Sequence, residues 1–175
     1  MRSPKRAAAG AGPRWLVTGG TGRLGRRLVD VLVGREASVA SVSRRPQARP
    51  RVTDFIWDLS AGSPPAAIAA WRPTHILHTA ALTDVDYCER NPGVARAVHV
   101  AGTERVMDLA ARTGARVLYV STDAVFNGKR GGYRDTDAID PINVYAQTKA
   151  EGEGHVLATH TGLIVRLNKI GRAHV

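Results

Sequence analysis

Short runs of apolar residues alternate along this chain with longer segments in which an apolar residue returns every three or four positions. The short runs predict strands buried on both faces, and the longer segments predict amphipathic helices. Strands that alternate with helices are typical of βαβ units and therefore of a parallel sheet. We expect six strands, at residues 15–18, 38–43, 54–57, 75–79, 116–121 and 163–166.

The expected helices are recognised by the spacing of their apolar residues and by the residues that can end them. A helix after the first strand can end at Gly34, and a longer one over 92–113 can end at Gly114. A third helix begins near Asn143, and a weaker one spans 64–71. The expected buried sides hold Leu24, Leu28, Val31 and Leu32 in the first helix, and Val94, Val98, Ala101, Val106, Leu109 and Ala110 in the second.

These elements predict one α/β domain over residues 14–168, with helices on both faces of a doubly wound parallel sheet. A chain of 175 residues, 43% hydrophobic and 5% aromatic, can bury a core of mainly alanine, valine and leucine. Residues 1–13 are basic and then rich in alanine and glycine, and Pro13 ends their weakly apolar stretch too early for a signal peptide. We expect them to form a disordered basic tail.

The net charge of +10 changes this picture little, because the arginines that carry it are scattered along the chain. No basic stripe interleaved with aromatic residues and no DNA-reading motif appears. No apolar run approaches the length of a membrane span. We therefore expect no nucleic-acid partner, no membrane partner and a cytoplasmic location. The single cysteine, Cys88, excludes a disulfide framework within the chain.

Three glycines follow the first strand with the spacing G-x-x-G-x-x-G: Gly19, Gly22 and Gly25. The chain must turn tightly, let a pyrophosphate approach its backbone and pack a helix against the sheet, and each step excludes a β-carbon. The motif lies between an apolar strand and an amphipathic helix, so it predicts a dinucleotide site at the helix N-terminus. The domain is then of the Rossmann type and binds NAD(P).

The end of the second strand favours NADP over NAD as the cofactor. An acidic residue there would bind the ribose hydroxyls of NAD, but the sequence reads Ser43-Arg44-Arg45. A guanidinium suits the 2′-phosphate of NADP, and we favour Arg44 for this role; Arg45 fits a solvated loop equally well. Two pairs that follow the third and fourth strands are expected beside the adenine and a ribose, respectively: Asp58-Leu59 and Ala80-Ala81.

A tyrosine and a lysine lie four residues apart in the third helix, Tyr145 and Lys149. They share a helix face, where we expect the lysine charge to lower the pKa of the phenol. The phenol can then give a proton to a carbonyl oxygen whose carbon receives a hydride, while the lysine also binds the nicotinamide ribose. Ser121-Thr122, which end the fifth strand, provide a hydroxyl to orient the carbonyl. With the glycines, these residues predict nicotinamide-dependent chemistry on a carbonyl or alcohol.

Metal and hydrolase chemistry find no such support. His75 and His78 lie on an expected strand, where residues three apart point to opposite faces. Asp84 and Asp86 have a suitable spacing but no further ligands, so we expect no metal site. A G-x-S-x-G nucleophile elbow does not occur in the sequence, which argues against a hydrolase.

Four segments resemble the extended short-chain dehydrogenases/reductases, and within them the dTDP-4-dehydrorhamnose reductase family: residues 17–25, 78–89, 120–128 and 141–149. The resemblance extends from about residue 14 to residue 168, and its most specific part is the Ser-Thr-Asp-x-Val-Phe stretch. It implies a catalytic trio of Thr122, Tyr145 and Lys149. The cofactor contacts that we expect in the glycine turn are Gly19, Thr21, Gly22, Arg23, Leu24 and Gly25, and those implied for the nicotinamide half are Ala80, Ala81 and Thr83.

The resemblance implies an NADP-dependent reductase of a nucleotide-linked 4-keto-6-deoxy sugar, in dTDP-rhamnose biosynthesis, with Tyr145 as general acid. A nucleotide sugar is then the partner, NAD is the alternative cofactor, and a homodimer is compatible with the sequence. One alternative is a sugar-nucleotide epimerase or dehydratase of the same fold. Another is a non-catalytic regulatory subunit that binds NADP.

The chain departs from the family pattern at three places. His99 stands where the family commonly has asparagine, and Ala124 where it usually has tyrosine. Family members continue well beyond the sixth strand, so we expect the substrate-binding C-terminal part to be missing. Residues 169–175 include a match to one reading frame of a common sequencing-library adapter, and we expect a non-native tail there. Such a chain is expected to bind cofactor without efficient turnover.

Overall fold

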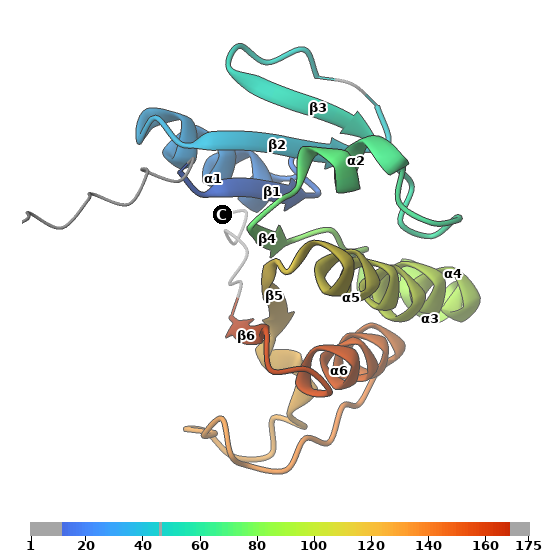
Figure 1. The fold of residues 1–175 in the computed structure, drawn as a ribbon. Coiled ribbons are helices and arrows are strands. Elements are labelled where there is room, and N and C mark those ends of the chain that lie inside the picture. The colour runs from blue at the N-terminus through green and yellow to red at the C-terminus, as the bar shows by residue number, and fades with distance from the viewer. Residues whose placement is uncertain (1–11, 46, 169–175) are drawn as a thin grey trace, which may run out of the picture.

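Six parallel strands form one sheet at the centre of the molecule (Figure 1). The computed structural model describes residues 12–45 and 47–168. The strands are β1 (Arg14–Thr18), β2 (Ser38–Ser43), β3 (Val52–Ile56), β4 (His75–His78), β5 (Arg116–Thr122) and β6 (Gly162–Leu167). Their order is β3-β2-β1-β4-β5-β6, so the direction of winding reverses at β1. This doubly wound order confirms the predicted fold class and places the reversal where such sheets bind ligands.

The helices cover both faces of this sheet. They are α1 (Arg23–Gly34), α2 (Ala66–Trp71), α3 (Val85–Arg90), α4 (Pro92–Arg96), the π-helical η1 (Ala97–Ala101), α5 (Gly102–Thr113), the 3-10 turn η2 (Asp123–Val125) and α6 (Val144–Leu157). Helix α1 packs on one face through a cluster that includes Val17, Val29 and Leu77. On the other face, α2, α5 and α6 enclose the larger cluster, with Leu16, Ile76 and further residues at its centre. Successive strand residues therefore point into different cores, and the strands read as continuous apolar runs.

The structure corrects several details of the sequence prediction. The third strand begins and ends earlier than expected, at Val52–Ile56 rather than 54–57. The expected helix over 92–113 is interrupted by the π-helical segment η1, and the short helix α3 was not predicted. Three residues expected on buried helix sides are instead exposed: Leu24, Val31 and Val94. The buried residues of helix α1 are instead Gly25 and Val29.

The predictions for the two ends of the chain fall largely outside the described residues. Of the expected tail 1–13, only Gly12 and Pro13 are described, and both are exposed. The expected non-native tail, 169–175, lies wholly outside. Within the described part of the chain, the model contains no helix that is both long and apolar enough to cross a membrane.

Candidate functional site

The turn between β1 and α1 is closed so tightly that two of the three motif glycines leave no room for a side chain. Gly19 has a φ of +68°, and a β-carbon there would lie 2.8 Å from the Cα of Ala80. At Gly25, a β-carbon would overlap the carbonyl oxygen of Gly19. A β-carbon at Gly22 would meet only that same oxygen, at 3.2 Å. Protein packing thus explains the first and third glycines of the motif.

The first turn of α1 presents backbone N–H groups that no side chain caps. Gly22 is the N-cap residue, it makes no side-chain cap bond, and the first turn contains no acidic residue. Arg23 and Leu24, which open the helix, and Thr21 before it are exposed. An uncapped helix N-terminus carries a partial positive charge and free donors, which together suit a phosphate group.

The segment that follows β4 is fastened beside this turn. Thr79 donates its hydroxyl to the carbonyl oxygen of Thr18 at 2.7 Å, and the N–H of Ala80 points to the Thr18 hydroxyl at 3.4 Å. Ala80 and Ala81 are half-buried, and Thr83 is exposed. These three expected cofactor contacts therefore lie at the same sheet edge as the glycine turn.

The residue predicted to contact the 2′-phosphate follows β2, and those predicted to contact the adenine follow β3. Arg44 and Arg45 are exposed, and the Arg44 charge helps to lower the pKa of Asp58, after the hydrogen bonds that Asp58 accepts from Ser60. Leu59 differs from its neighbour, because its side chain is buried in the larger core and its carbonyl accepts from Arg105 at 2.8 Å. The exposed member of the Asp58-Leu59 pair is thus Asp58.

Thr122 and Tyr145 come together at the end of β5. Helix α6 is started by Asn143, whose side chain accepts from the N–H of Ala146 at 2.8 Å, and this places Tyr145 in the first turn. The Tyr145 side chain is half-buried, and its phenol lies close enough to the Thr122 hydroxyl for that group to influence its pKa. Burial raises the pKa of Tyr145, and Thr122 offsets part of that rise. The phenol therefore holds its proton at neutral pH.

Lys149 points into the protein core, although its charge was expected to act on the Tyr145 phenol. Its Nζ donates to the carbonyl oxygen of Val120 at 2.8 Å and lies 3.9 Å from the centre of the Tyr119 ring. The side chain is only 2% exposed, and burial lowers its pKa to about 7, against an opposing effect of Glu153. Since the Tyr145 pKa is raised, the expected tuning of the phenol by this lysine is wrong for the structure as it stands.

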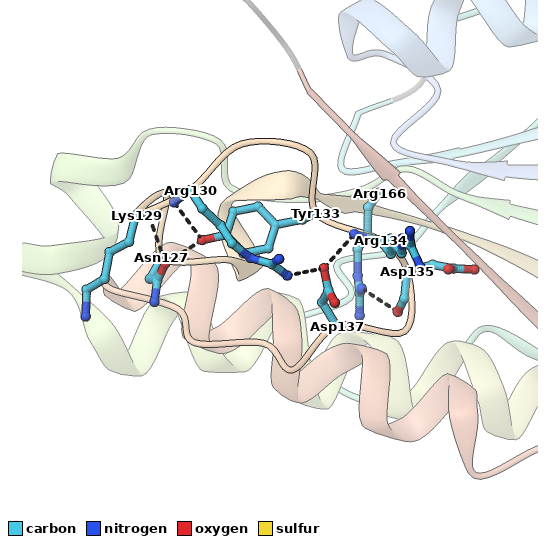
Figure 2. Close-up of polar contacts among 8 residues, drawn as sticks. All are labelled: Asn127, Lys129, Arg130, Tyr133, Arg134, Asp135, Asp137 and Arg166. Atoms are coloured by element: carbon cyan, nitrogen blue, oxygen red, sulfur yellow. Dashed lines mark hydrogen bonds and ion pairs between the residues drawn. The ribbon is translucent and has the colours of Figure 1, made fainter.

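The loop before α6 is tied to β6 through one arginine (Figure 2). Arg166 donates to the carbonyl oxygen of Asp135 at 3.3 Å. It also makes two bonds to the carboxylate of Glu153 in α6, at 3.0 and 2.7 Å, and Glu153 is 1% exposed. Within the loop, Arg130 pairs with Asp137. These contacts fix the position of α6 along the edge of the sheet.

A hollow of about 1190 Å³ lies between this loop and β6. Its walls include Phe126, Arg134 and Leu163. None of Thr122, Tyr145 and Lys149, the three residues expected to be catalytic, lines it. Among the described residues, no three histidine, cysteine, aspartate or glutamate side chains are grouped as a metal ion would require.

Two buried histidines near the site, His78 and His99, make contacts that the sequence did not reveal. As predicted, His75 and His78 point to opposite faces: the first stacks on Trp15, and the second bonds to Thr18 at 2.7 Å. His99 contacts the N–H of Leu82 at 2.9 Å and packs edge-on against the Tyr145 ring at 5.7 Å. The only sequence signal for His99 was its departure from the family asparagine.

The two histidines should make the protein sensitive to acid. Burial, and next the charge of Lys149, lower the pKa of His78 to about 3 and that of His99 to about 4. Below pH 6.5 the unfolded chain then binds protons that the folded chain does not, so stability falls as the pH drops from 6.5 toward these values. We expect each histidine to reduce the free energy of unfolding by about 2 kcal/mol at about pH 5, compared with about pH 7.5.

Urea unfolding at the two pH values measures this effect. His99→Gln should remove about half of the histidine-dependent loss. His160→Gln, which replaces an exposed histidine, should leave the pH dependence as in the parent chain. Equal acid sensitivity in His99→Gln and the parent would contradict the assignment.

Comparison with known proteins gives a consistent result. A family model described as the RmlD substrate binding domain matches residues 14–170. The dTDP-4-dehydrorhamnose reductase of Streptomyces griseus is 38% identical over an alignment of 157 residues, and the match covers 88% of this chain and 49% of that protein. The methionine adenosyltransferase 2 subunit beta of Xenopus tropicalis is 36% identical over 154 residues, with 88% and 46% covered.

Solved structures agree with these relatives. The crystal structure of dTDP-4-dehydrorhamnose reductase from Bacillus anthracis str. Ames, in complex with NADP, matches with a TM-score of 0.71 and 29% identity. The match covers 88% of this chain and 52% of that one. The chain therefore spans about half the length of the curated relatives that it matches.

Proposed function

Because this chain belongs to the family of the RmlD substrate binding domain, we propose that it is the NADP-binding half of a reductase acting on a nucleotide-linked 4-keto-6-deoxy sugar. The observation that carries the proposal is the placement of two groups at one edge of the sheet. The uncapped N-terminus of α1 follows the turn at Gly19, and Thr122 and Tyr145 lie next to each other at the end of β5. Carboxyl ends of parallel strands are where such sheets bind dinucleotides.

In this proposal the chain's own residues bind the cofactor, orient the substrate carbonyl and protonate its oxygen. The first turn of α1 binds the pyrophosphate, and Arg44 binds the 2′-phosphate. NADP supplies the hydride when it is bound. Thr122 orients the substrate carbonyl, and Tyr145 donates its proton to the oxygen as negative charge develops there. The raised pKa of Tyr145 supports the part of a proton donor, because the phenol is protonated at neutral pH.

Lys149 enters the proposal as a ligand of the nicotinamide ribose. Its present bond to the Val120 carbonyl leaves its ammonium inside the protein, so binding the ribose requires the side chain to reach out of the core. The lowered pKa, about 7, means that the ammonium is partly deprotonated at neutral pH. A hydrogen bond from a cofactor hydroxyl would then be accepted by the neutral amine as readily as one is donated by the ammonium.

A fluorescence titration with NADPH, followed by addition of a dTDP-linked 4-keto-6-deoxy sugar, tests the proposed function. Quenched or shifted NADPH fluorescence is expected on binding, and loss of NADPH absorbance on reduction. A chain that binds no NADPH at millimolar cofactor would contradict the whole proposal.

Arg44→Glu should separate the two nicotinamide cofactors. Reversing the charge beside the 2′-phosphate is expected to weaken NADPH binding by about tenfold or more and to leave NADH binding within about threefold, since NADH has no phosphate there. Arg116→Glu is the matched control, because it makes the same charge change at the exposed start of β5, the opposite edge of the sheet. Equal losses for both cofactors would show that Arg44 does not read the phosphate.

A second candidate function is a regulatory subunit that binds NADP without catalysing reduction. The observation that favours it is the 36% identity with the methionine adenosyltransferase 2 subunit beta. Under this alternative, the titration would show tight NADPH binding, and the keto sugar would cause no oxidation of NADPH even at high protein concentration.

A further inference from the structure

A chain of buried polar side chains connects the end of β1 with helix α6. Its members come from five separate elements and are at most 1% exposed: Thr18, His78, Thr103, His99 and Thr148. Neighbouring members lie within hydrogen-bond distance of one another or of one another's backbone. Buried polar groups are costly when left unpaired, so the direction of every bond in the chain can be worked out.

The bonds around His78 allow one tautomer of its imidazole. The Thr103 hydroxyl donates to the carbonyl oxygen of His99 at 2.5 Å, so it can only accept from Nε2 of His78, 3.1 Å away. That places the His78 proton on Nε2. Nδ1 must then accept from the Thr18 hydroxyl at 2.7 Å, and the Thr18 oxygen in turn faces the N–H of Ala80.

The bonds around His99 select the opposite tautomer. The N–H of Leu82 points to Nε2 of His99 at 2.9 Å, which makes this nitrogen the acceptor. The proton of His99 is therefore on Nδ1, where it is donated to the Thr148 oxygen at 2.8 Å. The Thr148 oxygen can accept this bond because its own hydroxyl hydrogen is donated to the carbonyl oxygen of Val144 at 2.8 Å. Every hydrogen bond of the two rings thus has one donor hydrogen and one acceptor.

Three parts of the proposed site meet at this chain of buried polar side chains. Thr18 directly precedes the turn at Gly19, and Leu82 directly precedes Thr83 in the segment after β4. Thr148 lies one turn beyond Tyr145, whose ring packs against His99. The π-helical segment η1 turns His99 into this position. Helix α6 also approaches it closely, since a β-carbon at Gly152 would lie 2.7 Å from the His99 carbonyl oxygen.

We propose that His78 and His99 are positioning residues that hold the phosphate-binding turn, the segment after β4 and helix α6 in one arrangement through this chain of directed hydrogen bonds. The proposal rests on the proposed function only for the identity of the parts that are joined. A second proton on His99 would lie on Nε2, where the Leu82 carbonyl oxygen, 3.1 Å away, can accept it, but the Leu82 N–H would then lose its acceptor. The arrangement therefore requires neutral imidazoles.

The surroundings of the two rings keep them neutral. Burial is the larger cause, and on α6 the ammonium form of Lys149 further disfavours a positive charge on either ring, while Tyr145 contributes an uncharged phenol. On β5, the uncharged Tyr119 lies 5.3 Å from His78. Glu153 acts mainly on Lys149 and pairs with Arg166. An anion that would favour an imidazolium is absent from the described contacts of both rings.

Nitrogen-15 spectra of the imidazoles test the bond directions in the parent chain, with no variant required. At neutral pH we expect His78 to be protonated on Nε2 and His99 on Nδ1, which give distinct nitrogen shifts and couplings. Both patterns should remain unchanged down to about pH 5. The opposite tautomer at either ring, or a rapidly exchanging mixture, would overturn the proposal.

A matched pair of amides tests the positioning by His99. Glutamine reaches the place of Nε2 and can keep the bond to Leu82, whereas asparagine reaches only the place of Nδ1 and can keep the bond to Thr148. We expect His99→Asn to speed exchange of the Leu82 amide hydrogen by about tenfold and to weaken NADPH binding by about tenfold, while His99→Gln changes each by less than about threefold.

Parallel unfolding measurements separate positioning from stability, because a purely structural effect would follow the unfolding free energy of each variant. Equal exchange and equal NADPH affinity in the two variants would refute the proposal. If the parent chain binds no NADPH, the proposed function fails by itself, and the imidazole tautomers and the Leu82 exchange rate still decide the positioning.

Discussion

Tyr145→Phe is expected to slow hydride transfer from NADPH to the keto sugar nucleotide by about a hundredfold to ten-thousandfold while NADPH affinity stays within about twofold. The ring keeps its packing against His99, so the only loss is the hydroxyl that donates the proton beside Thr122. A single-turnover measurement with protein in excess over NADPH detects this change even where steady turnover is slow.

Tyr87→Phe is the matched control for this experiment. It removes the hydroxyl of an exposed tyrosine on α3 and should leave the single-turnover rate unchanged. An undiminished rate in Tyr145→Phe would show that another group gives the proton. A loss of NADPH affinity in the same variant would instead assign Tyr145 to cofactor binding.

Gly25→Ala is expected to abolish measurable NADPH binding, with a loss of at least about a hundredfold, and to lower the free energy of unfolding by about 3 kcal/mol. A β-carbon at residue 25 would overlap the backbone of Gly19, which has no flexible end to move aside. Either α1 shifts away from the sheet or the turn opens. Both movements displace the N–H groups that are proposed to bind the pyrophosphate.

Gly34→Ala provides the control within the same helix. Nothing lies within 4 Å of a β-carbon at residue 34, the last residue of α1. This variant should bind NADPH like the parent and unfold at the same urea concentration or a slightly higher one. Unimpaired binding by Gly25→Ala would mean that the turn can rearrange without loss of the phosphate site.

The sequence was sufficient to predict the six strands and their doubly wound parallel sheet, because strands buried on both faces leave uninterrupted apolar runs. It located the turn at Gly19 for a related reason: only an apolar strand followed by an amphipathic helix gives the glycine spacing its meaning. Helix α6 was predicted to begin near Asn143 and to carry Tyr145 and Lys149, and the Asn143 side chain does cap its first turn.

Other features depend on contacts between distant parts of the chain and had no local signal. The direction of Lys149 is set by a carbonyl on β5, which spacing along α6 cannot reveal. The interruption at η1 places His99 against Leu82, yet the apolar pattern around it reads as one continuous helix. Leu59 illustrates the same limit, since a leucine after a strand suits the core and the cofactor edge equally.

The position of β1 in the middle of the sheet has a consequence for synthesis on the ribosome. Its first neighbour, β2, emerges soon afterwards, but its second neighbour, β4, is translated only when the chain has grown well past β3. During that interval one edge of β1 has no strand to pair with, although Leu16, Val17 and Thr18 of β1 are buried in the folded protein. Translational pausing in the stretch that encodes α2 would therefore prolong the stage at which nascent chains most need a chaperone.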